Sequence, residues 1–124
     1  MPMSAFYDPD EALARVEADI AAAQERASAA QEVRAKIDEV RGVARSERGE
    51  VVAQVDPTGL LRDLELSDAA TRLRADALST LIVRTVRAAM QDASRQAVAI
   101  MDDAFGAGSA VSRQLQDELD QRMR

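Results

Sequence analysis

Hydrophobic and polar positions along the first third of the chain follow the period of an α-helix. Asp8 and Pro9 suit the start of a helix, and no Gly or Pro interrupts the stretch from Asp10 to Arg41. The pattern predicts a helix over residues 9–39 with a coiled-coil-like seam, preceded by a disordered segment over residues 1–8. The seam positions, three or four residues apart with a slip of register before Val33, are Leu13, Val16, Ile20, Ala23, Ala27, Ala30, Val33, Ile37 and Val40.

Between Val40 and Leu66 the hydrophobic period changes to two, which is typical of β-strands. Residues 51–55 and 60–66 both alternate, and the turn sequence Asp56-Pro57-Thr58-Gly59 separates them. This arrangement predicts a hairpin of two antiparallel strands over those two ranges. A third strand is expected over residues 41–46, although its side chains are mostly small or charged.

Helical spacing returns after Ser67, and Gly106 supplies a stop signal. We expect a second long helix over residues 74–105 and a peripheral C-terminal helix or tail over residues 106–124. The prediction is therefore a single α+β domain over residues 9–105, with α-β-β-β-α order, a small antiparallel sheet and two long helices. The apolar stripe of the second helix consists of Leu78, Leu81, Ile82, Thr85, Val86, Ala89, Met90, Ala93, Ala97, Ile100, Met101 and Ala104.

The composition predicts a thin hydrophobic core. Ala accounts for 25 of the 124 residues, whereas Leu, Ile, Val and Phe together number only 27. A core shared between two chains would bury more apolar surface, so we expect an intertwined homodimer. The residues expected at the dimer interface are Val51, Val55, Leu64, Leu81, Val86 and Met90.

The missing residue types argue against catalysis. The chain has no Cys and no His, which removes thiolate chemistry, the usual general base and the commonest metal ligands. The acidic pair Asp102-Asp103 lies on a predicted helix, where adjacent carboxylates diverge instead of converging on a metal ion. We therefore expect no enzyme, no cofactor, no metal and no small-molecule substrate.

The distribution of apolar residues also predicts where the protein resides. No apolar run approaches the roughly 20 residues that span a bilayer, and the first residues lack the regions of a signal peptide. We expect a cytoplasmic protein without a membrane partner.

Charge is distributed unevenly along the chain. The formal net charge is −6, but residues 1–39 alone carry −5, which leaves the Arg-bearing segments near neutral or locally positive. Such Arg clusters can contact DNA phosphates, or they can form an ordinary solvated face with local ion pairs, which the composition alone favours. The candidate DNA-contacting residues, chosen by charge, are Arg41, Arg45, Arg48, Arg84 and Arg87.

Two stretches resemble the YbaB/EbfC family of bacterial nucleoid-associated proteins. Residues 51–66 (VVAQVDPTGLLRDLEL) are similar to the family's strand, turn and strand, and residues 78–89 (LSTLIVRTVRAA) to its helix signature. The resemblance covers roughly Gly42 to Ala93. Two positions depart from the pattern, because Pro57 replaces a Gly of the turn and Arg87 stands where the family often has Asn.

The resemblance implies a homodimer that binds duplex DNA with little sequence preference and organises or regulates the chromosome in the cytoplasm, at the nucleoid. It does not identify the DNA-contacting residues. An alternative is a protein-interaction or chaperone-like module, as in an actinobacterial branch of the family associated with type VII secretion. In that case the seam of Leu13, Val16 and Ile20 on the acidic first helix would bind a partner helix.

Overall fold

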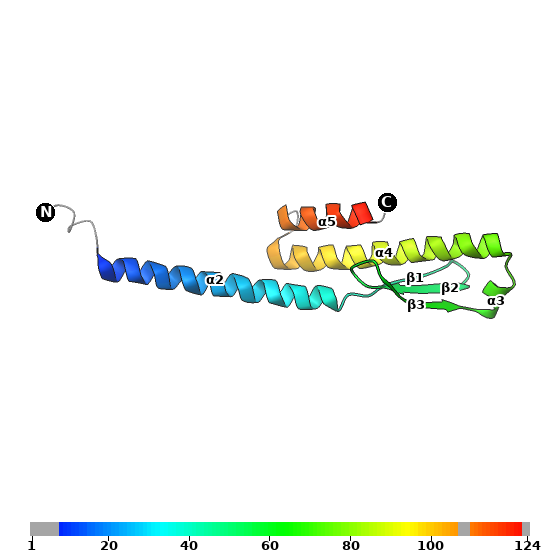
Figure 1. Ribbon diagram of the computed structural model, residues 1–124, viewed down its shortest axis with the longest axis horizontal. Coiled ribbons are helices and arrows are strands. Elements are labelled where there is room, and N and C mark those ends of the chain that lie inside the picture. Colours follow the sequence, from blue (N-terminus) through cyan, green and yellow to red (C-terminus); the bar gives the residue numbers. More distant parts are fainter. Residues whose placement is uncertain (1–7, 107–109, 123–124) are drawn as a thin grey trace. The chain divides into compact units, whose positions relative to one another are not determined.

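The computed structural model describes residues 8–106 and 110–122 (Figure 1). The elements are α2 (Pro9–Asp38), β1 (Gly42–Arg45), β2 (Val51–Val55), β3 (Leu61–Leu66), α3 (Asp68–Thr71), α4 (Ala75–Phe105) and α5 (Ala110–Arg122). The predicted α+β class and α-β-β-β-α order are confirmed. The segment expected to be disordered lies outside the described residues except for Asp8. The chain forms two compact units with a boundary between Glu32 and Val33.

The helix α2 begins at a capped N-terminus. The Asp8 carboxylate accepts a hydrogen bond from the backbone N–H of Asp10, which is one of the donors that a helix start leaves unpaired. Glu11 and Arg15 form an exposed ion pair of 3.1 Å one helical turn apart. Within the first unit, no described residue of α2 is buried. Further on, Val33 is buried and belongs to the second unit.

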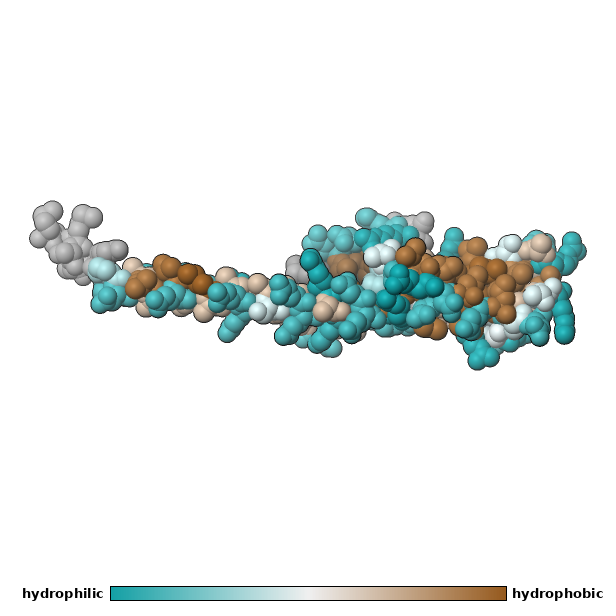
Figure 2. Space-filling view, turned by 60° about the horizontal axis from the view of Figure 1, so that its bottom comes forward, coloured by the Kyte–Doolittle hydropathy of each residue, from teal (hydrophilic) through white to brown (hydrophobic). Residues whose placement is uncertain are grey.

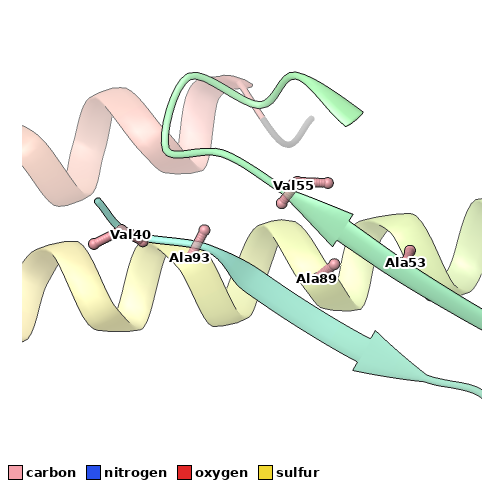
Figure 3. Packing of buried hydrophobic residues seen from close by; sticks show 5 residues of the cluster. All are labelled: Val40, Ala53, Val55, Ala89 and Ala93. Atoms are coloured by element: carbon pink, nitrogen blue, oxygen red, sulfur yellow. The ribbon is translucent and has the colours of Figure 1, made fainter. Parts of the chain in front are cut away.

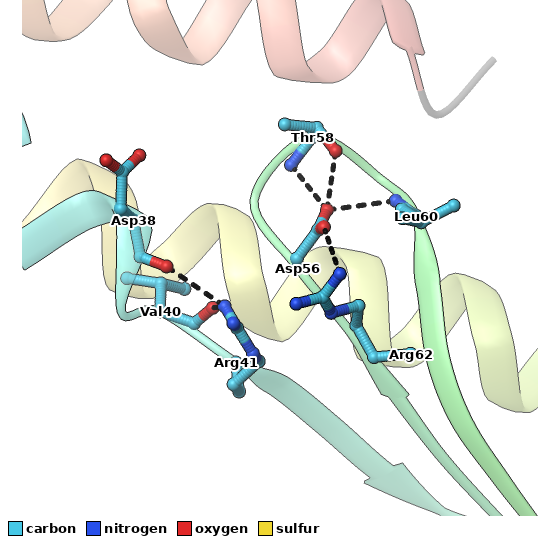
Figure 4. Close-up of polar contacts among 7 residues, drawn as sticks. All are labelled: Asp38, Val40, Arg41, Asp56, Thr58, Leu60 and Arg62. Carbon is cyan, nitrogen blue, oxygen red and sulfur yellow. Dashed lines mark hydrogen bonds and ion pairs between the residues drawn. The ribbon is translucent and has the colours of Figure 1, made fainter.

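The second unit is built on an antiparallel sheet with strand order β1-β2-β3. Gly42 of β1 pairs with Val55 of β2, and Val51 of β2 pairs with Leu66 of β3. The β2–β3 hairpin turns at Asp56, whose Oδ1 accepts hydrogen bonds from the Thr58 hydroxyl and from the backbone N–H groups of Thr58 and Leu60 (Figure 4). The turn sequence thus fixes the hairpin by satisfying its own backbone.

The core lies between the sheet and α4, which packs on β1 and β2. Its centre is a cluster of small aliphatic residues in which the helix and strands approach closely (Figure 3). A Cβ on Gly42 would collide with the backbone carbonyl oxygen of Ala89 and lie 2.6 Å from the backbone nitrogen of Ala93. Gly42 is therefore required for β1 to lie against α4. The buried cluster consists of Val40, Ala53, Val55, Ala89 and Ala93.

Two shorter helices complete the unit. The helix α3, which the hydrophobic pattern did not predict as a separate element, is capped by the Ser67 hydroxyl, which accepts from the Ala70 N–H. The helix α5 packs on α4 and buries Leu119. None of the described helices is both long and apolar enough to cross a bilayer.

The strand β3 carries leucines that α4 leaves uncovered. Val51 is fully buried, but its neighbour in register on β3, Leu66, is 43% exposed, and Leu61 is 41% exposed. Val83 on α4 is also exposed. Figure 2 shows hydrophobic side chains gathered over the region of α4 and the sheet. We call the exposed side chains of Leu61 and Leu66 on β3 the leucine face; they are apolar surface that the described residues leave exposed.

Candidate nucleic-acid interface

Two side chains of α4 hold β1 in place. The Asp92 carboxylate accepts a hydrogen bond of 2.9 Å from the backbone N–H of Val43. Gln96 donates through Nε2 to the backbone carbonyl of Arg41 and to the Asp92 carboxylate, each at 2.9 Å. These bonds satisfy backbone groups on the outer edge of β1 and fix its register against α4. As a result, the end of β1 lies beside the first half of α4.

A hollow of about 470 Å³ lies at this junction. Arg45 at the end of β1 and Arg48 in the β1–β2 turn line it from one side, and Arg84 of α4 lines it from the other. Residues far apart in the sequence are thus brought to one site. The remaining lining residues are Ser46, Glu47, Glu50, Leu81, Thr85 and Ala88.

The β1–β2 turn shapes one wall of this hollow. The backbone N–H of Gly49 donates to the Ser46 carbonyl, and the Ser46 hydroxyl accepts from the Val51 N–H at 3.0 Å. Gly49 has φ +75°, and a Cβ there would lie 2.5 Å from the guanidinium of Arg45. The positive φ therefore favours glycine at this position, and a Cβ would also require the flexible end of the Arg45 side chain to move.

A second hollow of about 350 Å³ adjoins the first along α4. Arg84 lines both hollows, and Arg87 lines the second together with Ser79, Thr80 and Val83. We call the four arginines 45, 48, 84 and 87 the arginine strip. It combines two charge clusters that are separate in the sequence.

The arginine strip retains its hydrogen-bonding capacity for a ligand. Within the described part of the chain, none of its four guanidinium groups forms an ion pair. A free guanidinium offers several N–H donors in a plane that matches the oxygens of a phosphate. The Ser79 and Thr80 hydroxyls of the second hollow already donate to helix carbonyls one turn earlier. The chemistry of the strip is therefore that of an anion-binding surface.

Glu50 is one of two acidic residues, with Glu47, that line the hollow between the arginines. Its Oε1 atom is buried and lacks a hydrogen-bond partner, although the residue lines the hollow with three arginines. A buried acceptor without a donor costs about 1–3 kcal/mol. The hydrophobic pattern and the charge count gave no indication of this role for Glu50, because its position depends on the folded turn.

Arg41 has a different role from the other candidate arginines. Its Nη1 atom donates to the backbone carbonyls of Asp38 at 3.0 Å and Val40 at 2.7 Å (Figure 4). It therefore satisfies carbonyls that the end of α2 leaves unpaired. Arg41 lines neither hollow.

The residues expected at a dimer interface fall into three groups. Val51 and Val55 are completely buried within their own chain, so they have no surface left for a second copy. Leu64, Val86 and Met90 are half-buried and pack around the core cluster. Leu81 instead lines the hollow of the arginine strip. The other predicted seam, Leu13, Val16 and Ile20, is exposed on α2.

The carboxylates of the described residues are dispersed or committed to turns. Among the described residues, no group of three or more acidic side chains is placed to hold a metal ion. The most perturbed carboxyl is that of Asp56, where the hydrogen bond from the Thr58 hydroxyl chiefly lowers the pKa, helped by backbone N–H donors and by Arg62 at 4.0 Å. That carboxylate stabilises the hairpin turn.

A comparison with protein families matches this chain to a DNA-binding family, which is consistent with an anion-binding surface. The profile of the YbaB/EbfC DNA-binding family matches residues 13–108. The chain belongs to the YbaB/EbfC family. The match includes every residue of the arginine strip, both hollows and the leucine face. A comparison with curated protein sequences found no significant match.

The structure shows where the two departures from the YbaB/EbfC pattern, Pro57 and Arg87, lie. Pro57 occupies the hairpin turn, where Asp56 still organises the loop and Gly59 has φ +89°. Arg87 lies in the arginine strip, where it adds a positive charge. The family is defined by DNA binding and not by a reaction.

Proposed function

We propose that this protein binds duplex DNA through the arginine strip, with little sequence preference, and that it acts on the bacterial nucleoid within the cytoplasm. The observation that carries the proposal is the convergence of Arg45, Arg48 and Arg84 on one hollow, where none of them is in an ion pair with any residue that the structure describes. Family membership supports DNA as the ligand. Arginine contacts to phosphate oxygens position a protein on DNA but carry little sequence information.

The proposed DNA-binding form is a homodimer. The leucine face supports this, because a surface of exposed leucines next to a small core is apolar area that a second copy would bury. A twofold dimer would present two arginine strips to one duplex. Doubling the phosphate contacts offsets the overall acidity of the chain, whose net charge is −6.

Mobility shifts on random duplex DNA across a salt series test the proposal. The wild type should shift DNA at micromolar concentration, and its affinity should fall steeply with salt. Combined Arg84→Ala and Arg87→Ala substitutions should weaken binding on all sequences alike. Each lost phosphate contact should reduce the slope of log K against log salt by about 0.9. Arg45→Ala with Arg48→Ala should act in the same direction.

A double substitution on α5, Arg113→Ala with Arg122→Ala, is the matched control. It removes the same charge from exposed positions outside the arginine strip and should weaken binding far less. Absence of any shift by the wild type near physiological salt would overturn the DNA-binding proposal. Equal losses in the strip and control variants would overturn only the assignment of the surface.

A further inference from the structure

The first unit contains an apolar seam that the described residues leave exposed. Leu13, Val16 and Ile20 are 57%, 52% and 53% exposed. Figure 2 shows hydrophobic side chains gathered on the N-terminal half of α2. The seam continues through the exposed alanines 23, 27 and 30. A long helix without a packed face gains little stability in water from its own hydrogen bonds. Packing the exposed seam of residues 9–30 against a partner would therefore bury apolar surface and stabilise the helix.

We propose that this seam pairs with the same seam of a second copy, with the two helices antiparallel. This self-association surface is additional to the leucine face and does not depend on DNA binding. It involves only residues of the first unit. The argument rests on two kinds of complementarity within the seam, in side-chain size and in charge.

Side-chain size favours the antiparallel orientation. The N-terminal half of the seam carries large residues and the C-terminal half carries only alanines, with heptad spacing maintained throughout. In an antiparallel pair each large residue meets an alanine of the other copy, and the helices can approach closely. The layers are Leu13 with Ala30, Val16 with Ala27, and Ile20 with Ala23, each formed twice. A parallel pair would instead stack alanine on alanine and leave that half poorly packed.

Charge favours the same orientation and register. Asp19 and Arg26 precede Ile20 and Ala27, so they flank the seam on the same side, seven residues apart. Neither forms an ion pair within the described chain. In the antiparallel register, Asp19 of each copy lies beside Arg26 of the other, which gives two ion pairs across the interface. The same register brings Glu17 next to Gln24.

A charge-exchange experiment on the full chain tests the pairing. Asp19→Arg alone, or Arg26→Asp alone, places like charges opposite each other twice and should weaken self-association about tenfold at low salt. An equimolar mixture of the two variants restores two opposite-charge pairs per interface. Light scattering should therefore show a reduced mass for each variant alone and recovery of the wild-type mass in the mixture. A parallel pair, in which Asp19 lies near Gln24, predicts no such recovery.

A Leu66→Glu background separates this pairing from the leucine face. In that background we expect a species of twice 13.4 kDa, which the Asp19→Arg substitution converts toward monomer. Glu25→Arg, an equal charge change at an exposed position on the opposite side of α2, is the matched control and should leave the mass unchanged. Circular dichroism verifies that each variant is folded.

Two results would overturn the inference. One is an unchanged mass in both single variants, which would leave the seam free for a helix of another protein. The other is a mixture that keeps the reduced mass of its components. DNA mobility shifts by the same variants report separately on the arginine strip, so failure of one proposal is distinguishable from failure of the other.

Discussion

The negative charge of Glu50 lies among the arginines of the hollow and weakens the attraction of this site for phosphate. Its carboxylate is partly buried without a donor, so replacing it by a neutral amide removes both a desolvated charge and a repulsion toward phosphate. We predict that Glu50→Gln binds duplex DNA about threefold more tightly, the size expected for one exposed charge interaction. Fluorescence anisotropy on labelled duplex measures the change.

Glu65→Gln is the control for Glu50→Gln, because Glu65 is exposed on β3 and does not line the hollow. It makes the same change in net charge. If both variants gain affinity equally, net charge alone explains the effect and Glu50 has no special place in the site.

Asp56 makes the stability of the hairpin depend on pH. Because the Thr58 hydroxyl and the other donors lower the pKa of Asp56 below its ordinary value of 3.8, the folded state favours the carboxylate. This stabilisation is present above the ordinary value and is lost as the pH falls through the lowered pKa. We predict that Thr58→Val raises the pKa of Asp56 and lowers the free energy of unfolding at pH 6 by about 1 kcal/mol.

NMR titration of the Asp56 carboxyl and urea unfolding at pH 6 and pH 3 measure both effects of Thr58→Val. The difference in stability between variant and wild type should shrink at pH 3, because the pH has then fallen below the ordinary pKa of 3.8 toward the lowered pKa of Asp56. A difference of the same size at both pH values would contradict the role assigned to this hydrogen bond.

At the scale of elements, the attachment of β1 to α4 depends on Asp92. Asp92→Ala leaves the backbone N–H of Val43 without its acceptor and frees Gln96 from one of its two contacts. We predict a loss of about 1–2 kcal/mol in the free energy of unfolding. Weaker DNA binding should accompany this loss, since β1 carries Arg45 into the strip. Gln91→Ala, an exposed change one position earlier on α4, should have little effect on either measurement.

The elements with strong periodicity could be predicted from sequence, and those defined by packing could not. The long helices and the β2–β3 hairpin follow from spacing and turn residues, because a single stretch of chain contains all of the signal. The strand β1 has little apolar character, since Gly42 and Ala44 are small in order to fit against α4. The helix α3 likewise could not be predicted, because its four residues are too few to show a helical hydrophobic period.

The sequence predicted the arginines of the candidate site but not that they lie close together. Charge counting found two Arg clusters, but their union depends on the contact between β1 and α4, which no local pattern encodes. For the same reason, charge counting could not distinguish Arg41, which caps the end of α2, from Arg45, which lines the hollow. The prediction that Val51 and Val55 lie at a dimer interface rests on their apolar character, which does not reveal which chain buries a residue.

At the scale of the whole molecule, the leucine face predicts how two copies associate. In a chain that also carries Asp19→Arg, Leu66→Glu places a charge in this face and should convert a dimer formed there to monomer at low micromolar concentration. Analytical ultracentrifugation measures the change. Val43→Glu is the control, because Val43 is similarly exposed but alternates with the β1 residues that face α4. Dimers that persist in Leu66→Glu, in a chain that also carries Asp19→Arg, would exclude the leucine face as their interface.

The two outer strands of the sheet differ in a way that affects behaviour at high concentration. Asp92 accepts from the Val43 N–H of β1, and Gln96 donates to the carbonyl of Arg41 just before it, so a foreign strand cannot pair there without displacing them. Fibril growth by stacking sheets edge to edge requires two open edges on every subunit. Because the β1 edge is occupied, another molecule can add a strand only at β3. One open edge allows two sheets to pair but does not allow a continuous stack, so the fold disfavours amyloid-like polymerisation.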